Sequence, residues 1–273
     1  MTDAERTGPD PTVSPPGPLR RAVAELLGTM FLVAAVVGSG IAATQLSPGQ
    51  PGLQLLINSV ATGAALSALI LALHPISASF NPIVTVIDAV TGVLSARAAA
   101  GLITAQTVGG AVGAVVANLM FGLEPIQIAA QDRGGGGLLL GEAIATLGLV
   151  LVVAGTARAR QPGQVAAAVG LYIGAAYWFT SSTSFANPAV TIARTLSDTF
   201  AGIAPGSVAP FIAAQLAGGA LALALVTYLH RPTTPTRDTP AETADGDHSH
   251  DAESSTWRPE QAPTHLRTTG RTP

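Results

Sequence analysis

The stretch SFANPAVTIARTL, residues 184–196, places an Asn-Pro pair inside an otherwise apolar chain. A closely similar stretch, SFNPIVTVIDAV, lies at residues 79–90. Asn is favoured at the N-cap of a helix, and Pro is favoured at the first helical position because the N–H it lacks would have no partner there. The two stretches therefore predict two short helices that begin at Asn81 and Asn187.

The composition around these stretches is that of a membrane protein. Of the 273 residues, 48% are hydrophobic and only 11% are charged, whereas a typical soluble domain carries about 25% charged residues. About 20 apolar residues of helix cross a bilayer. Six apolar runs are long enough to do so: 21–46, 52–73, 97–121, 138–157, 163–180 and 207–229. We therefore predict an all-α membrane protein with six transmembrane helices and two half-helices.

The two ends of the chain differ from this block. Residues 1–18 and 231–273 are rich in Pro, Thr, Asp and Glu, which cannot build a buried core, so we expect two disordered tails. The membrane domain is expected over 19–230. His248 and His250 fall in the second tail, where we interpret them as an incidental polar cluster rather than a metal site. The net charge of -3 gives no indication of nucleic-acid binding, and the absence of Cys excludes a thiolate metal site.

The membrane domain repeats internally. Residues 24–40 resemble 141–157, which aligns Glu25 with Glu142. In the same way AQTVGGAVGA at 105–114 resembles AQLAGGALAL at 214–223, and this aligns Gln106 with Gln215.

The two halves run through the membrane in opposite directions. Repeat one covers about 20–121 and repeat two about 138–230, and each holds three spans, an odd number. Inverted repeats of this kind build sites at the bilayer midplane from broken helices. The half-helices should then meet N-terminus to N-terminus, with the amides of Asn81 and Asn187 offered as donors.

The arginines predict an orientation. Cytoplasmic loops carry an excess of Lys and Arg. The larger group, all on one side of the predicted spans, consists of Arg20, Arg21, Arg97, Arg158, Arg160 and Arg231, whereas Arg133 and Arg194 lie on the other side. We therefore expect both termini to be cytoplasmic, in a multi-pass protein of the cell inner membrane.

Together these features resemble the aquaporin and glycerol-facilitator family, the major intrinsic proteins. The resemblance covers about residues 20–230 and rests on the two Asn-Pro boxes, the two repeated glutamates and AQTVGGAVGA. It implies a passive pore in each subunit, a homotetramer in membrane lipid, and permeation by water or small neutral solutes. It also implies no cofactor and no enzymatic step, and it gives Glu25 and Glu142 the role of holding the loops before the half-helices. For Gln106 and Gln215, hydrogen bonding between helices is favoured over a place in the pore.

The boxes depart from the family pattern. The first reads Asn81-Pro82-Ile83, where Ala is usual at the third position, and the second reads Asn187-Pro188-Ala189. Many members carry Arg directly after the second box, whereas this chain has Val190, a reading similar to a bacterial subgroup with NPAVT. Counting from the two asparagines places the other three filter positions at Thr62 (or Ala61), Ala175 and Ser184.

These filter residues are all small, so a wide and weakly polar filter is expected. It favours solutes larger than water: glycerol-like polyols, urea-like molecules or metalloid hydroxides such as arsenous acid. A water-selective pore is one alternative. A secondary transporter is another, because it can also have inverted repeats and broken helices. Against a transporter, the spans hold no chain of carboxylates beyond Glu25 and Glu142 to carry a proton.

Arg194 lies four residues beyond Val190, one helical turn further along the same face. Asp88 holds the equivalent position in the first half-helix. Two interpretations stay open at this point. Arg194 and Asp88 could mark the two pore mouths, or Arg194 could form a surface ion pair with Asp198.

Overall fold

The computed structural model describes residues 16–157 and 162–230. The predicted tails, with His248 and His250, therefore lie outside the described residues, except at positions 16–18. The predicted N-terminal tail, 1–18, overlaps the first helix by one residue, because that helix begins at Pro18.

The described residues form six long helices: α1 (Pro18–Leu46), α2 (Pro51–Leu73), α4 (Ala96–Met120), α5 (Gly136–Ala157), α6 (Pro162–Phe179) and α8 (Pro205–Leu229). These match the six predicted spans to within three residues at each end. Two short helices lie between them: α3 (Pro82–Val90) and α7 (Pro188–Ala193), the latter continued by the 3-10 turn η1 (Arg194–Leu196).

Among the described helices, α1, α2, α4, α5 and α8 are long and apolar enough to cross a membrane by length and composition. The remaining long helix, α6, has 18 residues. Gln164, Tyr172 and Tyr177 lower its hydropathy.

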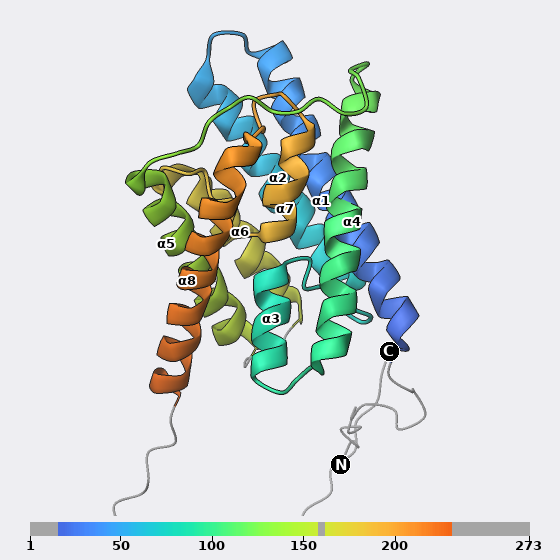
Figure 1. Ribbon diagram of the computed structural model, residues 1–273, viewed down its shortest axis with the longest axis vertical. Coiled ribbons are helices and arrows are strands. Elements are labelled where there is room, and N and C mark those ends of the chain that lie inside the picture. The colour runs from blue at the N-terminus through green and yellow to red at the C-terminus, as the bar shows by residue number, and fades with distance from the viewer. Residues whose placement is uncertain (1–15, 158–161, 231–273) are drawn as a thin grey trace, which may run out of the picture. The chain divides into compact units, whose positions relative to one another are not determined.

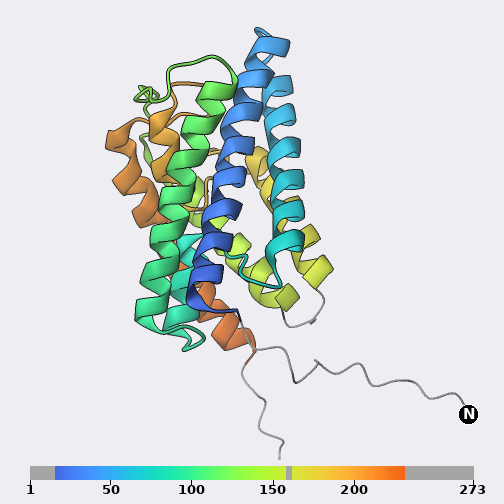
Figure 2. The ribbon, with the colours of Figure 1, turned by 90° about the vertical axis from the view of Figure 1, so that its right-hand side faces the viewer.

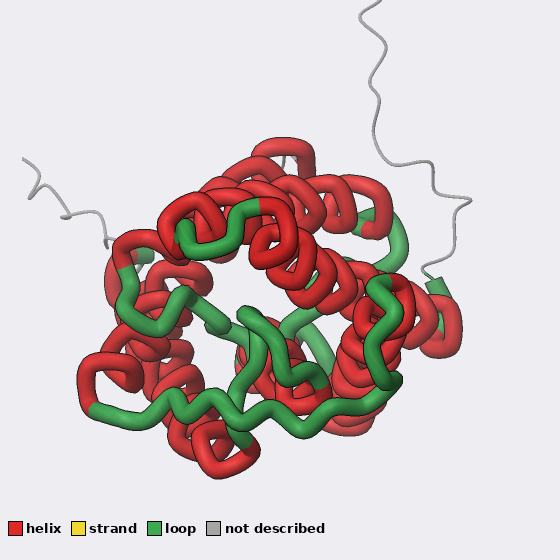
Figure 3. The backbone as a smooth tube through the Cα atoms, turned by 90° about the horizontal axis from the view of Figure 1, so that it is seen from above, coloured by secondary structure: helices red, strands yellow, loops and turns green. Residues whose placement is uncertain are grey.

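The repeat is visible in the packing of the bundle. Helix α1 packs along α4, and its repeat equivalent α5 packs along α8. The beginnings of α1 and α4 lie at the same end of the bundle as the ends of α5 and α8 (Figure 1). The segment joining α4 to α5 crosses the opposite end, beside α7 (Figures 1 and 2). Seen along the bundle, loop segments lie within a ring of helices (Figure 3).

Small residues allow the two helix pairs to approach closely. A Cβ atom on Gly109 of α4 would lie 2.2 Å from the carbonyl oxygen of Leu26 on α1. A Cβ atom on Gly218 of α8, the repeat equivalent, would lie 2.2 Å from the carbonyl oxygen of Ala143 on α5. Close backbone contact at small residues is how helices associate in lipid, where hydrophobic attraction between them is weak.

The unusual Ile83 of the first box is accommodated by packing. Its side chain is 2% exposed and belongs to a cluster with Val150 and Ala222. A Cβ atom on Gly219 would lie 2.7 Å from Ile83 Cγ2. The extra volume relative to Ala therefore fills a space that a glycine leaves open on α8.

Candidate functional site

The two asparagines cap the half-helices, as the sequence predicts. The Oδ1 atom of Asn81 accepts from the backbone N–H of Ile83 at 2.9 Å. The Oδ1 atom of Asn187 accepts from the N–H groups of Ala189 at 3.0 Å and Val190 at 3.3 Å. Both caps have extended backbone and are followed by Pro at the first helical position.

The same two asparagines also bond crosswise between the repeats. Asn81 Nδ2 donates to the carbonyl of Ala186 at 2.8 Å, and Asn187 Nδ2 donates to the carbonyl of Phe80 at 2.7 Å. The beginnings of α3 and α7 are thereby joined. A side-chain amide carries two N–H donors, and both asparagines line the central cavity. Each therefore has a second donor for a molecule in that cavity.

The residues before the asparagines have strained backbone. Phe80 and Ala186 have φ of 46° and 48°, a left-handed conformation that costs on the order of 1–3 kcal/mol for a residue other than Gly. Both are held on two sides. The N–H of Phe80 donates to Glu25 at 2.7 Å, that of Ala186 donates to Glu142 at 2.9 Å, and each carbonyl accepts from the asparagine of the opposite repeat.

Each glutamate accepts several hydrogen bonds from the loop that precedes a half-helix. Glu25 accepts from the Ser77 hydroxyl at 2.5 Å and from the N–H of Ser79 at 2.9 Å, in addition to Phe80. Glu142 accepts from the N–H of Phe185 at 2.8 Å, in addition to Ala186. Both carboxylates are fully buried, so these hydrogen bonds replace their hydration.

The two glutamines connect long helices to half-helices. Gln106 Nε2 donates to Glu25 at 2.9 Å and to the Thr85 hydroxyl of α3 at 2.9 Å. Gln215 Nε2 donates to Glu142 at 2.6 Å and to the Thr191 hydroxyl of α7 at 2.9 Å. Both glutamines are fully buried. They make hydrogen bonds between helices, as favoured from the sequence, and are not among the residues that line the cavity described below.

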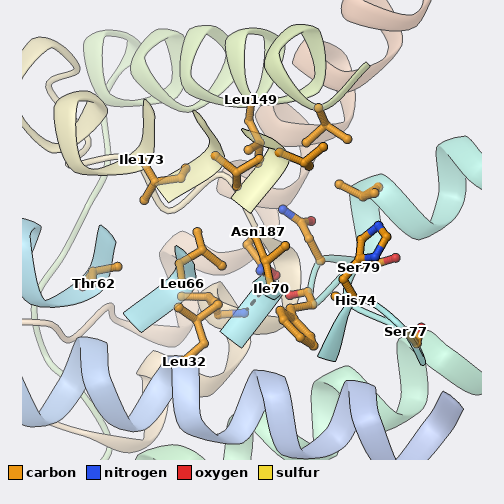
Figure 4. A pocket seen from close by; sticks show the side chains of 18 of the residues that line it. Leu32, Thr62, Leu66, Ile70, His74, Ser77, Ser79, Leu149, Ile173 and Asn187 are labelled. Carbon is orange, nitrogen blue, oxygen red and sulfur yellow. Dashed lines mark hydrogen bonds between the residues drawn. The ribbon is translucent and has the colours of Figure 1, made fainter. Parts of the chain in front are cut away.

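A cavity of about 550 Å³ runs past the meeting point of the half-helices. Side chains spaced four residues apart line much of it. On α2 and just after its end they are Thr62, Leu66, Ile70 and His74, and on α6 they are Val165, Val169, Ile173 and Tyr177. Figure 4 shows Leu32, Leu66, Ile70, Leu149 and Ile173 around Asn187. This part of the wall is mainly apolar.

Another part of the wall is more polar. It includes the loop residues 76–80 together with Asn81, Asn187 and Ser184. The Ser184 hydroxyl is buried and has no hydrogen-bond partner in the described part of the chain. The cavity therefore combines an apolar side with a side that offers hydrogen bonds.

Three of the four predicted filter residues line the cavity, namely Thr62, Ser184 and Val190. The placement of Ala175 is wrong, because this residue is exposed on α6 and is absent from the lining. Tyr177, two residues later, lines the cavity, and its hydroxyl donates to the Thr62 hydroxyl at 3.2 Å. Sequence counting mistook the register of α6, and the four-residue spacing of Val165, Val169, Ile173 and Tyr177 could have corrected it.

The remaining box residues pack away from the cavity, since its lining includes Asn81 and Asn187 but not Pro82, Ile83, Pro188 or Ala189. Asp88 borders the cavity near the end of α3, and Arg194 borders it near the end of α7. Arg194 is 2% exposed, and its Nε donates to the carbonyl of Ala201. Asp198 is exposed and accepts instead from the N–H of Ala130 at 3.0 Å. No ion pair joins Arg194 to Asp198 in the structure as described, so the surface-pair interpretation is wrong.

A second buried arginine lies beside Arg194. Arg133 comes from the segment between α4 and α5, is 8% exposed, and donates through Nε to the carbonyl of Gly202 at 2.8 Å. The Cζ atoms of Arg194 and Arg133 lie 3.4 Å and 4.9 Å from the centroid of the Phe185 ring. Burial lowers the pKa of Arg133 to about 10, against an opposing effect of Glu142, so the guanidinium stays charged at neutral pH.

Sequence reasoning used Arg133 only for orientation and did not single out Tyr177 or Phe185. A second cavity, of about 160 Å³, lies at this end and is lined by Asn58, Gln131, Arg133, Thr183, Arg194 and Phe200.

Comparisons with known proteins agree with this geometry. The family model described as "Major intrinsic protein" matches residues 13–184. The chain is 47% identical over 227 residues to "Aquaglyceroporin AqpS" of Rhizobium meliloti (strain 1021), an alignment covering 82% of this chain and 97% of that protein. Its fold is similar to the X-ray structure of the aquaglyceroporin from Plasmodium falciparum, with a TM-score of 0.62, 18% identity, and coverage of 77% of this chain and 95% of that one. At that identity the likeness concerns the fold alone.

Proposed function

We propose a solute class for this chain, which belongs to the major intrinsic protein family and is a membrane channel rather than an enzyme. Its solutes are small, neutral and polar: glycerol-like polyols, urea-like molecules and metalloid hydroxides such as arsenous acid, with water also passing.

The two-sided lining of the cavity is the observation that carries this proposal. Leu66, Ile70 and Ile173 offer apolar contact, while Asn81 and Asn187 offer hydrogen bonds. A polyol has a hydrocarbon side and a hydroxyl side, so both of its surfaces find suitable partners. An ion would lose its hydration against the apolar side, and the cost of burying an unpaired charge is high.

We assign the constriction to the α7 end of the cavity. Thr62, Tyr177, Ser184 and Val190 would form its walls, and Arg194 would place a positive charge at this mouth. Asp88 would place a negative charge at the other mouth. With the Tyr177 ring in its wall, this filter would be narrower and more polar than the four small residues expected from sequence.

The orientation is supported by the arginines of the first turns. Arg20 and Arg21 lie in the first turn of α1 and Arg97 in that of α4, and these helices begin at the same end of the bundle (Figure 1). By the positive-inside rule, this end and both termini would be cytoplasmic in the cell inner membrane.

The surroundings we propose are lipid and other copies of the chain in a homotetramer. Large apolar side chains are exposed on α2 and α6: Leu56, Val60, Leu171, Trp178 and Phe179. Surfaces of this kind need hydrocarbon or another subunit against them. The mass of the protein in mild detergent tests the number of copies.

The test of the function is a flux panel in proteoliposomes without any ion gradient. Water, glycerol, urea and arsenous acid are compared by stopped-flow shrinking and swelling, or by arsenic uptake, against empty liposomes. We expect solute flux with a weak temperature dependence. Flux of water alone would favour the water-selective alternative, and solute uptake only under a proton or sodium gradient would favour a transporter.

A further inference from the structure

We propose that Arg194 is the specificity-determining cation of the constriction at the α7 end, and that Phe185 and Arg133 position it there. The inference rests on the proposed function, because a filter residue matters only if solutes pass. It names a residue one helical turn away from Val190, the position at which many members of the family carry their arginine.

The location of Arg194 is the first step. Among the described residues, Arg194 is the one that lines both the cavity of about 550 Å³ and the cavity of about 160 Å³. Its side chain therefore stands at the boundary between them. On the path that we propose, which joins the two cavities, a solute would pass this side chain.

Helix geometry explains how position 194 reaches this place. Residues four apart lie on one face of a helix, and side chains lean toward the helix N-terminus. The side chain of Arg194 thus extends back along α7, on the side of Val190. Its guanidinium stacks on Phe185, which lies in the loop before α7, so the charge is held close to where that loop and the half-helix meet the cavity.

The hydrogen bonds of Arg194 leave donors for a solute. A guanidinium carries five N–H donors. Within the described residues, only Nε donates a hydrogen bond, and its acceptor is the carbonyl of Ala201. The ring of Phe185 fixes the plane of the group without using a donor. The terminal N–H groups are therefore available to oxygen atoms of a passing solute, and the charge repels cations.

The constriction then has three different sides. Arg194 supplies charge and donors, Tyr177 and Thr62 form a hydrogen-bonded hydroxyl pair, and Val190 supplies an apolar surface. This combination suits a neutral molecule with both hydroxyl and apolar parts.

Arg133 helps to hold Arg194 in place through contacts with the same ring and the same loop segment. Its guanidinium lies over the same ring. It donates to the carbonyl of Gly202 at 2.8 Å and to that of Phe200 at 3.4 Å. The carbonyl that accepts from Arg194 belongs to Ala201, between these two residues. Arg133 therefore fixes the segment that orients Arg194, and it adds a second positive charge to this mouth.

The experiment measures cation leak and the glycerol-to-water flux ratio in proteoliposomes. Arg194→Leu, Arg194→Gln, Arg194→Lys and Arg133→Gln are compared with Arg97→Gln, a control that removes an exposed charge in the first turn of α4. Detergent chromatography confirms that each variant is folded. If Arg194→Leu does not fold, Arg194→Gln tests the same loss of charge with a polar side chain.

We expect Arg194→Leu and Arg194→Gln to raise cation leak by roughly tenfold or more, because a nearby charge in a poorly solvated site contributes a barrier of that size. Arg194→Lys should restore cation exclusion but change the flux ratio, because an ammonium is not a planar donor that stacks on Phe185. Arg133→Gln should raise cation leak less than Arg194→Leu or Arg194→Gln does. It should change the glycerol-to-water flux ratio in the same direction as these two variants. Arg97→Gln should match the wild type.

Two failures are distinguishable. If the wild type passes glycerol but folded Arg194→Leu or Arg194→Gln keeps both its cation exclusion and its flux ratio, the inference is overturned and the proposed function stands. If the wild type passes no solute other than water, the proposed function itself fails.

Discussion

Asn187 donates a hydrogen bond from its side-chain amide to the carbonyl of Phe80, at 2.7 Å and across 107 residues of sequence. Asn81 makes the reciprocal bond to Ala186. Both acceptors have left-handed backbone, so each bond stabilises a conformation that is otherwise unfavourable. The asparagines thus have two structural tasks, since they begin the half-helices and join the two repeats, and both also line the cavity.

The first prediction separates these tasks at Asn187. The change Asn187→Asp keeps the oxygen that caps Ala189 but removes the donor to Phe80. A buried carbonyl left without a partner costs about 1–3 kcal/mol, and a carboxylate beside it adds repulsion. We expect a lower thermal unfolding midpoint in detergent and reduced glycerol flux.

The reverse change Asp198→Asn is the control, because this exposed side chain keeps its acceptor for Ala130. Wild-type stability together with wild-type flux in Asn187→Asp would contradict the crosswise bond.

The second prediction concerns the contact between α1 and α4. A Cβ atom on Gly113 would lie 2.2 Å from the carbonyl oxygen of Met30, whereas one on Gly101 of the same helix meets nothing within 4 Å. Overpacking of this kind costs about 1–3 kcal/mol, so Gly113→Ala should lower the unfolding midpoint. Gly101→Ala should leave it unchanged or raise it slightly, because Ala favours helix over Gly. Equal midpoints for the two variants would argue against this close packing.

The third prediction tests the loop-holding carboxylates. In Glu142→Gln, an NH2 group replaces one of the two carboxylate oxygens. One of these oxygens accepts from Phe185, and the other accepts from Ala186 and Gln215. A donor then faces a donor, and hydrogen bonds to a charge are worth about 1.5–3 kcal/mol each. We expect less folded protein and a clearly lower unfolding midpoint. Glu124→Gln, at an exposed position, is the matched control and should behave as the wild type.

The architecture was predictable from sequence because its signals are local. Asn-Pro pairs, apolar runs and repeated glutamates can each be read over a few residues. The residues of the filter were harder to predict from sequence. Ala and Gly recur along the sequence of α6 itself, so its composition did not show whether Ala175 or Tyr177 faces the cavity. The contact between Arg133 and Phe185 could not be predicted, because it joins segments that only the folded chain brings together.

The fourth prediction tests this correction in α6. Tyr177→Phe removes the hydroxyl that donates to Thr62, which leaves one fewer polar group at the constriction. We expect the glycerol-to-water flux ratio to change while folding is kept. Ala175→Val alters an exposed position on the same helix and should leave the ratio unchanged. A change of ratio in Ala175→Val but not in Tyr177→Phe would restore the register counted from sequence.

The fifth prediction places an arginine where many family members have one. Val190 is 5% exposed and lines the cavity, so Val190→Arg puts a large side chain into the lumen close to Arg194. The two guanidinium groups repel each other, and the added volume narrows the passage. Glycerol flux should therefore fall much more than water flux, as measured by stopped flow on one set of proteoliposomes. Val190→Leu separates the causes, because it adds volume without charge and should give a smaller effect. An unchanged ratio in Val190→Arg would mean that this position lies outside the constriction, and the filter would then have to be sought elsewhere along the cavity.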